Sequence, residues 1–537
     1  MWQQVYLPVA NSLTLSTLTA AIPIFVLLLL VGIMRKPPWV AGLAGLAASF
    51  VVAIGAYEMP VPLAVSSVGY GAAFGLFPIC WIVFWAVVLY RLTLETGKFE
   101  IIKDSIGGLT SDRRLQAMLI AFALGAFIEG AAGFGTPVAV AATMLVGLGF
   151  SRFYAAGICL LANTAPVAFG SIGIPVVALA GMTGIPELEL SGWVGSICAP
   201  VSLFIPAYLI LVMGGVNALR GVLPAAAVCG ISFATTQFLV SNFIGPQLTD
   251  IASGLAAIAC MVLLLLVWKP ADTFHLEGET EVTYDVKSHG FWKTVHAWSP
   301  YLFLVVLVLM WGTSWFKNNV LETATMVIQW PGLHNLVARM PPVVGEPTAY
   351  AALFTLNWLS AAGTACMLAT MAGAAALGVS PAGYVRVLVV VFKQLFLAIV
   401  TITSVLGFAF LMNYSGAAAT LGLAFASTGF IFPFFSALLG WLGVFLTGSD
   451  TSSNALFANL QVVTANQLGL DPAILASANS AGGVMGKMIS LQSIAVAGAA
   501  TEMKSSEQAQ LFRFTLKHSI FLASVLGMIT MVYAYTF

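Results

Sequence analysis

The chain has 537 residues, of which 60% are hydrophobic and 7% are charged, and its acidic and basic side chains balance to a formal net charge of zero at pH 7. Soluble domains carry about 25% charged residues, so this composition excludes a water-soluble globule and predicts a membrane protein whose main partner is lipid. A zero net charge without a basic tail argues against nucleic acid as a partner.

Apolar stretches long enough to cross a hydrocarbon core recur along the chain, from Leu13–Met34 to Ser519–Tyr535. A helix needs about 20 residues to span about 30 Å, and we count roughly 12–14 such stretches. The first has no basic residue before it and no small-residue cleavage site after it, which favours a retained helix over a signal peptide. The sequence therefore predicts an all-α polytopic membrane protein.

Basic residues in short loops mark the cytoplasmic side of a membrane protein. Arg35 and Lys36 follow the first span, and a basic loop at residues 91–114 comes two spans later. Both loops are therefore expected inside, with the N-terminus outside.

A polar insert divides the chain into two membrane halves. Residues 269–298 hold three lysines and are expected to form a cytoplasmic linker between an N-terminal half (1–268) and a C-terminal half (299–537). A weaker polar insert at residues 317–347 predicts an external loop.

Two short words recur in the same order in the two halves. Leu124–Gly130 (LGAFIEG) matches Leu442–Gly448 (LGVFLTG), and after a similar interval Ala162–Ala165 (ANTA) matches Ala478–Ala481 (ANSA). Transporters are often built from duplicated halves. The matches therefore predict an internal repeat with interrupted helices.

The charges around the two copies predict that the repeat is inverted. Arg113, Arg114 and Arg152 bracket the first copy, whereas Gln394–Gly486, around the second, holds no Lys or Arg. Under the positive-inside rule the first copy starts and ends inside, and the second starts and ends outside. Leu115–Phe150 must then enter and return, as a span followed by a re-entrant hairpin would.

The first copy carries an ionisable residue in a broken apolar run, Glu129–Pro137. Gly133 and Gly135 weaken a continuous helix, the proline breaks it, and the freed backbone becomes a candidate for substrate binding. Counted from Arg114 at 1.5 Å per residue, Glu129 lies about 22 Å into the membrane. A carboxylate at that depth is a candidate for proton coupling; the alternative is a cap on the following half-helix.

In the second copy, Thr447–Asn454 is rich in hydroxyl groups and carries Asp450 between apolar segments. Lipid satisfies none of these groups. Asp450 is therefore a second candidate for proton coupling and Ser452 a candidate substrate ligand, with Asn454 as a weaker one. The alternative is an ordinary extracellular loop.

The paired words also hold Asn163 and Asn479, which are followed by Pro166 and by Gly482. We expect each asparagine to mark a point where a helix unwinds and where amide groups bind substrate. The alternative is hydrogen bonding between packed helices.

Lys487 stands in an otherwise uncharged apolar run and is the best candidate to hold a substrate carboxylate. Lys393 is a second cation within a predicted span, but it can extend to the surface near Arg386. Lys393 and Gln492 are the weaker candidates for substrate binding.

Motifs for enzymatic or ATP-driven chemistry are absent from the sequence. The six cysteines stand singly in apolar runs, as buried thiols do. The five histidines lack metal-ligand spacing, and no Gly-x-x-x-x-Gly-Lys-Ser/Thr motif occurs. We therefore expect no metal, no cofactor and no enzymatic activity.

The sequence resembles the bacterial L-lactate permease family, which includes the glycolate permeases. The likeness runs over nearly the whole chain and is carried by the two broken segments together with Asn163–Gly170, Ser241–Pro246 and Ser480–Ser490. It implies a multi-pass symporter of the bacterial cytoplasmic membrane that imports L-lactate, often with D-lactate and glycolate, together with protons. One departure is Leu491, where the family usually has proline; this predicts a helix that runs on past Lys487.

The resemblance and the candidate residues together suggest one mechanism. Importing an anion against an inside-negative potential costs about 2.3 kcal/mol per 100 mV, which a co-transported proton removes. Lys487 and helix N-termini would hold the carboxylate. The hydroxyl group would bind Asn163, Asn479 and Ser452, and the proton would be carried by Glu129 or Asp450.

Three alternatives remain open on the residues. The oxygens around Asp450 also suit sodium, so sodium-coupled carboxylate transport is the first. A passive organic-anion channel is the second, and a membrane-embedded enzyme is the third. The sequence makes no prediction of oligomeric state.

Overall fold

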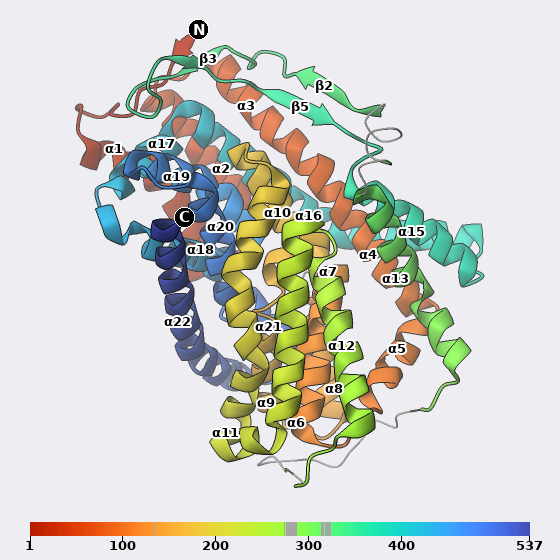
Figure 1. The fold of residues 1–537 in the computed structure, drawn as a ribbon. Helices are drawn as coiled ribbons and strands as arrows, with labels where there is room; N and C mark the ends of the chain where they lie inside the picture. Colours follow the sequence, from red (N-terminus) through yellow and green to blue (C-terminus); the bar gives the residue numbers. More distant parts are fainter. Residues whose placement is uncertain (134, 273, 275–286, 313–315, 317–323) are drawn as a thin grey trace.

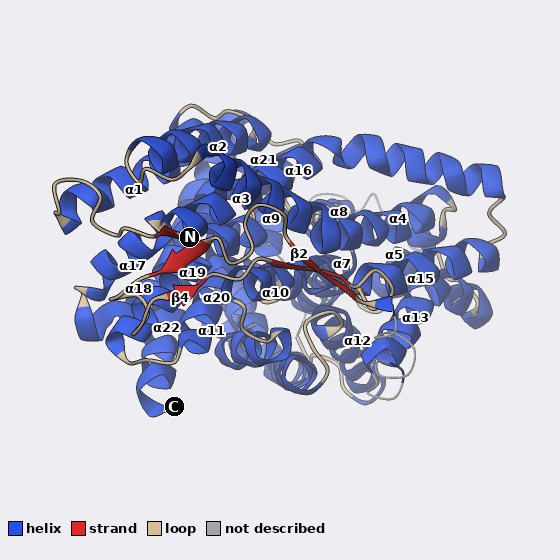
Figure 2. Cartoon of the chain, turned by 90° about the horizontal axis from the view of Figure 1, so that it is seen from above, coloured by secondary structure: helices blue, strands red, loops and turns tan. Residues whose placement is uncertain are grey.

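The computed structural model describes residues 1–133, 135–272, 274, 287–312, 316 and 324–537, and helices dominate it (Figures 1 and 2). Within these residues, eleven helices are long and apolar enough to cross a membrane, and the bent pair Arg152–Ala162 with Val167–Thr183 would add a twelfth span. The prediction of an all-α polytopic membrane protein is confirmed. Three further apolar helices are too short to cross alone: Thr136–Gly147, Ala362–Ala376 and Ala417–Ala426.

The chain starts with three spans. Ser12 begins the first helix by accepting a hydrogen bond from the Leu15 N–H, and Pro38 begins the next, where a missing N–H leaves no donor unpaired. The third span runs through 35 residues with an irregular middle. These elements are α1 (Leu13–Leu28), η1 (Leu29–Ile33), α2 (Pro38–Gly55), α3 (Val61–Phe74), η2 (Gly75–Cys80), α4 (Trp81–Glu95) and the short α5 (Lys98–Gly107).

The first copy of the repeat contains two helix breaks and a re-entrant hairpin. The guanidinium of Arg113 donates a hydrogen bond to the carbonyl oxygen of Leu148, so both ends of Leu115–Phe150 lie on one face. The predicted entry and return of this segment is confirmed. Its elements are α6 (Arg113–Gln116), η3 (Ala117–Leu124), α7 (Gly125–Ala131), α8 (Thr136–Gly147), α9 (Arg152–Ala162), η4 (Val167–Phe169) and α10 (Gly170–Thr183).

Helix α11 (Glu187–Phe243) folds back on itself. Its backbone leaves the helical region at Gly215 and Val222, and a Cβ atom on Gly192 would lie 2.9 Å from the Asn242 side chain, so its two ends lie side by side. It is followed by α12 (Thr249–Val267) and, beyond the linker, by α13 (Phe291–Gly312).

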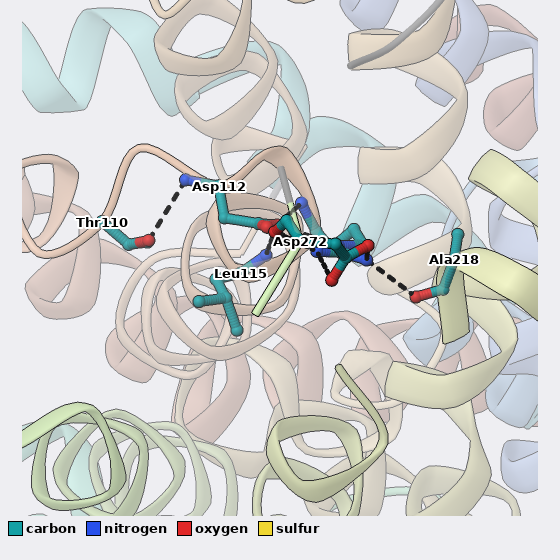
Figure 3. Close-up of polar contacts among 6 residues, drawn as sticks. Thr110, Asp112, Leu115, Ala218 and Asp272 are labelled. Atoms are coloured by element: carbon teal, nitrogen blue, oxygen red, sulfur yellow. Dashed lines mark hydrogen bonds and ion pairs between the residues drawn. The ribbon is translucent and has the colours of Figure 1, made fainter. Parts of the chain in front are cut away.

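Polar contacts hold both ends of the predicted linker against one face of the protein. The buried Arg114 pairs with Asp112 at 2.7 Å and with Asp272 at 2.9 Å (Figure 3). His289 contacts Asp104 at 2.7 Å. The linker therefore shares a face with the basic loop, as expected, although its residues 273 and 275–286 lie outside the described part of the chain.

Short strands cover the opposite face, where the sequence predicted a loop. They are β1 (Trp2–Gln3), β2 (Met326–Gln329), β3 (Val337–Arg339), β4 (Thr348–Ala349) and β5 (Leu353–Leu356). β3 pairs with β1 in parallel and with β4 in antiparallel, and β2 pairs with β5 in antiparallel. Residues 317–323 of the predicted loop lie outside the described residues. The N-terminus and the strands thus share the face opposite the linker (Figure 1).

The C-terminal half contains the second copy of the repeat. Its helices are α15 (Ala362–Ala376), α16 (Pro381–Ser415), α17 (Ala417–Ala426), η7 (Gly429–Ile431), α18 (Phe432–Thr447), α19 (Asp450–Leu468), α20 (Pro472–Lys487), α21 (Leu491–Ala500) and α22 (Ser505–Thr536). α16 packs against α2 and α3, so helices from both sides of the linker interleave. The division into two halves stays a prediction from the sequence.

The second hairpin enters from the face opposite to the first. Gln467, at the end of α19, donates a hydrogen bond of 2.7 Å to the carbonyl oxygen of Pro342, beside the strands. Glu502, after α21, pairs with Arg152 at 3.0 Å, on the face where the first hairpin begins. α18–α19 and α20–α21 therefore mirror α7–α8 and α9–α10 in the inverted order that the charges predicted.

Candidate functional site

The breaks of the two repeats meet around a central cavity of about 420 Å³. Helices α10, α19 and α21 begin at this cavity, and α7, α18 and α20 end there. Helix N-termini favour negative charge, so three of them directed at one cavity suit an anion. The polar residues that line it are Glu129, Ser171, Thr447, Ser449, Asp450, Thr451, Ser452, Lys487, Gln492 and Thr401. Below it is called the central cavity.

Lys487 is the cation of the central cavity. It is the last residue of α20, where the helix dipole favours a positive charge, and its ammonium group donates a hydrogen bond of 2.6 Å to the carbonyl oxygen of Gly448. The carboxyl groups of Glu129 and Asp450 both lie close enough to attract it. An ammonium group has three donors, so Lys487 can also bind a substrate anion.

Asp450 begins α19, directly after the break in the second copy. Ser480 donates a hydrogen bond of 2.6 Å to its Oδ2 atom, whereas Oδ1 has no partner among the described residues. Gly483 packs against that free oxygen, and a side chain there would collide with it. One oxygen of the Asp450 carboxyl group is thus hydrogen-bonded and the other is not. The prediction that Asp450 lies inside the protein rather than in an extracellular loop is confirmed.

Glu129 lies in the last turn of α7 and is 4% exposed. Its Oε2 atom has no hydrogen-bond partner among the described residues, and a Cβ atom on Gly170 would lie 2.6 Å from Oε1. Helix α8 begins after Gly135, which has no side chain to cap it. The Asn163 side chain lies beside Glu129.

The first turn of α10 carries backbone strain next to these charges. Ser171 and Ile172 have φ angles of 48° and 61°, a left-handed conformation that costs about 1–2 kcal/mol per non-glycine residue. Ser171 lines the cavity and donates a hydrogen bond of 3.0 Å to the carbonyl oxygen of Ala132, in the other break. Strain of this kind gathers at functional sites. Sequence reasoning missed Ser171, although the glycines and the proline of Gly170–Pro175 indicate an interrupted helix there.

The two matched asparagines differ in structure. Asn163 follows the end of α9, as predicted, and its side chain is buried beside the Glu129 carboxyl group. Asn479 lies inside the unbroken helix α20, so the prediction that it marks an unwound turn is wrong. Its amide group donates to Asn454 at 2.9 Å and accepts from Gln461 at 3.2 Å. Asn479 and Asn454 therefore join packed helices, and neither lines the central cavity.

The remaining candidates divide between the cavity and its surroundings. Ser452 and Gln492 line it. Gly133 and Gly135 form the turn between α7 and α8 with φ angles of 61° and 78°, and do not line it. Lys393 lies exposed on α16, also outside the lining.

Helix α20 ends at Lys487 although Leu491 occupies the position at which the family usually has proline. α20 stops at Lys487, and Leu491 occupies the first position of α21, after the capping residue Ser490. The prediction that Leu491 lets the helix run on is wrong, because the first helical position accepts proline or leucine without loss of a hydrogen bond.

Asp250 is a buried carboxylate that sequence reasoning missed. It lies in the first turn of α12, is 1% exposed and interacts electrostatically with Glu129. Asp250 follows the Gly245–Pro246 turn closely, as an acidic residue does at an ordinary helix start on the membrane surface. The sequence therefore showed no sign that Asp250 is buried.

A second cavity of about 520 Å³ lies beneath the strands and is called the outer cavity. Tyr350 and Tyr414 line it, and the guanidinium of Arg339 stands 3.7 Å from the centre of the Tyr350 ring. Pro175 lines the central cavity and Val177 the outer one. Less than one turn of α10 therefore separates their linings at this point.

Comparisons with known proteins identify relatives over the whole chain. The model of the family described as L-lactate permease matches residues 16–537. The L-lactate permease of Bacillus subtilis strain 168 is 44% identical, covering 100% of this chain and 99% of its own. The glycolate permease GlcA of Escherichia coli K12 is also 44% identical, covering 100% and 98%.

The fold of this chain is similar to that of a solved membrane protein. Neisseria gonorrhoeae MtrF, which represents a class of antimetabolite efflux pumps, superimposes with a TM-score of 0.51 at 12% sequence identity, covering 95% of this chain and 97% of its own. At that identity the likeness concerns the fold alone.

Proposed function

The chain belongs to the L-lactate permease family, and we propose that it imports L-lactate, with D-lactate and glycolate, by proton symport across the bacterial cytoplasmic membrane. Members of this family are permeases, so the chain is a transporter and not an enzyme. The observation that carries the proposal is that Lys487 and two buried carboxyl groups, those of Glu129 and Asp450, line the same central cavity.

The substrate carboxylate would bind Lys487 and the N-termini of the half-helices. Lys487 is the only Lys or Arg among the described residues that line the cavity. The hydroxyl group of a 2-hydroxy acid would bind Ser452, together with Ser171 from the opposite repeat. Asn479 does not bind the substrate hydroxyl group in this proposal, because its side-chain amide is already hydrogen-bonded to Asn454 and Gln461.

Glu129 and Asp450 would carry the proton. Each has one carboxyl oxygen without a partner among the described residues, and an isolated charge at this depth costs about 3 kcal/mol or more. Lys487 supplies one positive charge for two carboxyl groups, so the second carboxyl group is neutralised by binding a proton. Symport of that proton would cancel the charge of the substrate and the electrical cost of its import.

The two cavities support alternating access to the substrate. The lining of the central cavity includes the exposed Pro37 and Pro38, which follow the basic pair Arg35–Lys36 on the expected cytoplasmic side. The outer cavity lies on the strand face. In this conformation the substrate site would be open to the cytoplasm and closed to the outside by α10.

The test is uptake of radiolabelled L-lactate by proteoliposomes in sodium-free buffer with acid outside. We expect accumulation above equilibrium that a protonophore abolishes. Equilibration without accumulation would instead indicate a passive channel. A strict requirement for sodium, with choline unable to replace it, would indicate sodium coupling.

A further inference from the structure

Asp250 has no structural partner that explains its burial. It is 1% exposed, and neither Oδ1 nor Oδ2 accepts or donates a hydrogen bond within the described residues. A buried polar group without a partner costs about 1–3 kcal/mol, and an unpaired buried charge costs more. Such a residue in a membrane helix points to a ligand that is bound and released.

The fold brings Asp250 against the residue that follows Glu129. Helix α12 packs on α7 so closely that a Cβ atom on Gly130 would lie 2.8 Å from the Asp250 Cβ atom and 2.9 Å from the backbone nitrogen of Ile251. Only glycine leaves room for this approach. Asp250 therefore lies against the residue that follows Glu129, at a helix contact that position 130 makes possible, and the charge of Glu129 acts on the Asp250 carboxyl group.

The groups that face Asp250 are acidic or neutral. Helix α7 presents Glu129, and α11 presents the thiol of Cys198. Helix α10, which also packs on α12, has no ionisable residue, and η3 has none. Lys487 interacts electrostatically with Glu129 and Asp450. Two neighbouring carboxyl groups in such surroundings cannot both be ionised without strong repulsion.

We propose that Glu129 and Asp250 form a carboxyl pair that binds one exchangeable proton, with Asp250 as the member behind the cavity wall. Glu129 lines the central cavity and Asp250 does not. A proton taken up from the cavity by the Glu129 carboxylate passes to the Asp250 carboxylate when the two side chains come into hydrogen-bond contact, which they do not make in this conformation, and returns by the same route; no bond other than O–H changes. The inference rests on the proposed proton symport and adds a residue that the sequence did not suggest.

The pair predicts a specific change in the pH profile of transport. Asp250→Asn keeps the size of the side chain but removes one negative charge, so Glu129 alone holds the proton less tightly. We expect the pH of half-maximal gradient-driven uptake to move toward acid by about one unit or more. Lactate exchange between equal concentrations at equal pH should stay within about twofold of the wild type, because exchange requires no proton release. Glu189→Gln, an exposed carboxylate at the start of α11, is the matched control and should change neither.

Each outcome decides the proposal. A pH profile of Asp250→Asn that superimposes on the wild type would overturn it. So would loss of exchange in both Asp250→Asn and the smaller Asp250→Ser, since this would make Asp250 a structural residue. Failure of the proposed function itself is separate, because the wild-type protein would then show no gradient-driven accumulation at any pH.

Discussion

The ammonium group of Lys487 donates a hydrogen bond of 2.6 Å to the backbone carbonyl oxygen of Gly448. This contact joins the end of α20 to the break between α18 and α19. It fixes the one lysine of the described cavity lining at the point where the helices of the second repeat begin and end.

The first prediction concerns that lysine. Lys487→Met removes the cation from the cavity, and we expect kcat/KM for lactate uptake to fall at least about 30-fold, equivalent to about 2 kcal/mol. Lys393→Met is the matched control, because Lys393 is exposed outside the cavity, and it should stay within about twofold. Equal losses in both variants, measured at equal amounts of folded protein, would contradict the assignment.

The second prediction separates proton coupling from substrate binding. In Glu129→Gln and Asp450→Asn a neutral amide replaces a carboxyl group, so the proton carrier should lose gradient-driven accumulation. Exchange of lactate across the membrane should persist in that variant, because the binding cation remains. If both variants accumulate lactate as the wild type does, neither residue carries the proton.

The third prediction concerns the break after Lys487. Leu491→Pro should leave uptake within about twofold and the unfolding temperature nearly unchanged, because Leu491 is at the first position of α21 and Ser490 already has an extended backbone. Val484→Pro, inside α20, should destabilise the protein by about 3 kcal/mol or more. A large loss in Leu491→Pro would show that the backbone N–H of Leu491 has a role.

The fourth prediction concerns the linker. The guanidinium of Arg114 lowers the pKa of the Asp272 carboxyl group below its ordinary value. A lowered pKa adds stability above the ordinary value of about 3.9, and this stability is lost as the pH falls through the lowered pKa. Asp272→Asn should therefore lower the unfolding temperature in detergent at pH 7, and the difference should vanish at strongly acidic pH. A difference that persists there, or that equally affects the exposed Glu346→Gln, would exclude the ion pair as its cause.

The sequence predicted the central charges well because lipid makes them conspicuous. Glu129, Asp450 and Lys487 interrupt apolar runs, and the structure brings all three to one cavity. Their partners were harder to predict. The Ala478–Ala481 sequence is compatible with a broken helix and with a continuous one. Hydrogen bonds of Asn479 with Asn454 and Gln461 stabilise the continuous helix.

Other features depend on contacts that a single sequence does not display. The strands have two to four residues each, too few for a periodic pattern, and β1 pairs with β3 across more than half of the chain. Asp250 becomes informative only when α12 is seen to lie on Gly130. The inverted orientation was predictable because Arg113, Arg114 and Arg152 lie at both ends of the first copy, and the positive-inside rule places these ends in the cytoplasm.

The positions of the native cysteines allow a cysteine introduced into the central cavity to be labelled selectively. All six cysteines are free, five are buried, and none belongs to the described lining of the central cavity. A single cysteine introduced at Thr401 would therefore be the main site for a water-soluble maleimide added to sealed vesicles. The side from which labelling succeeds, with and without lactate, would follow the opening and closing of the cavity in the membrane.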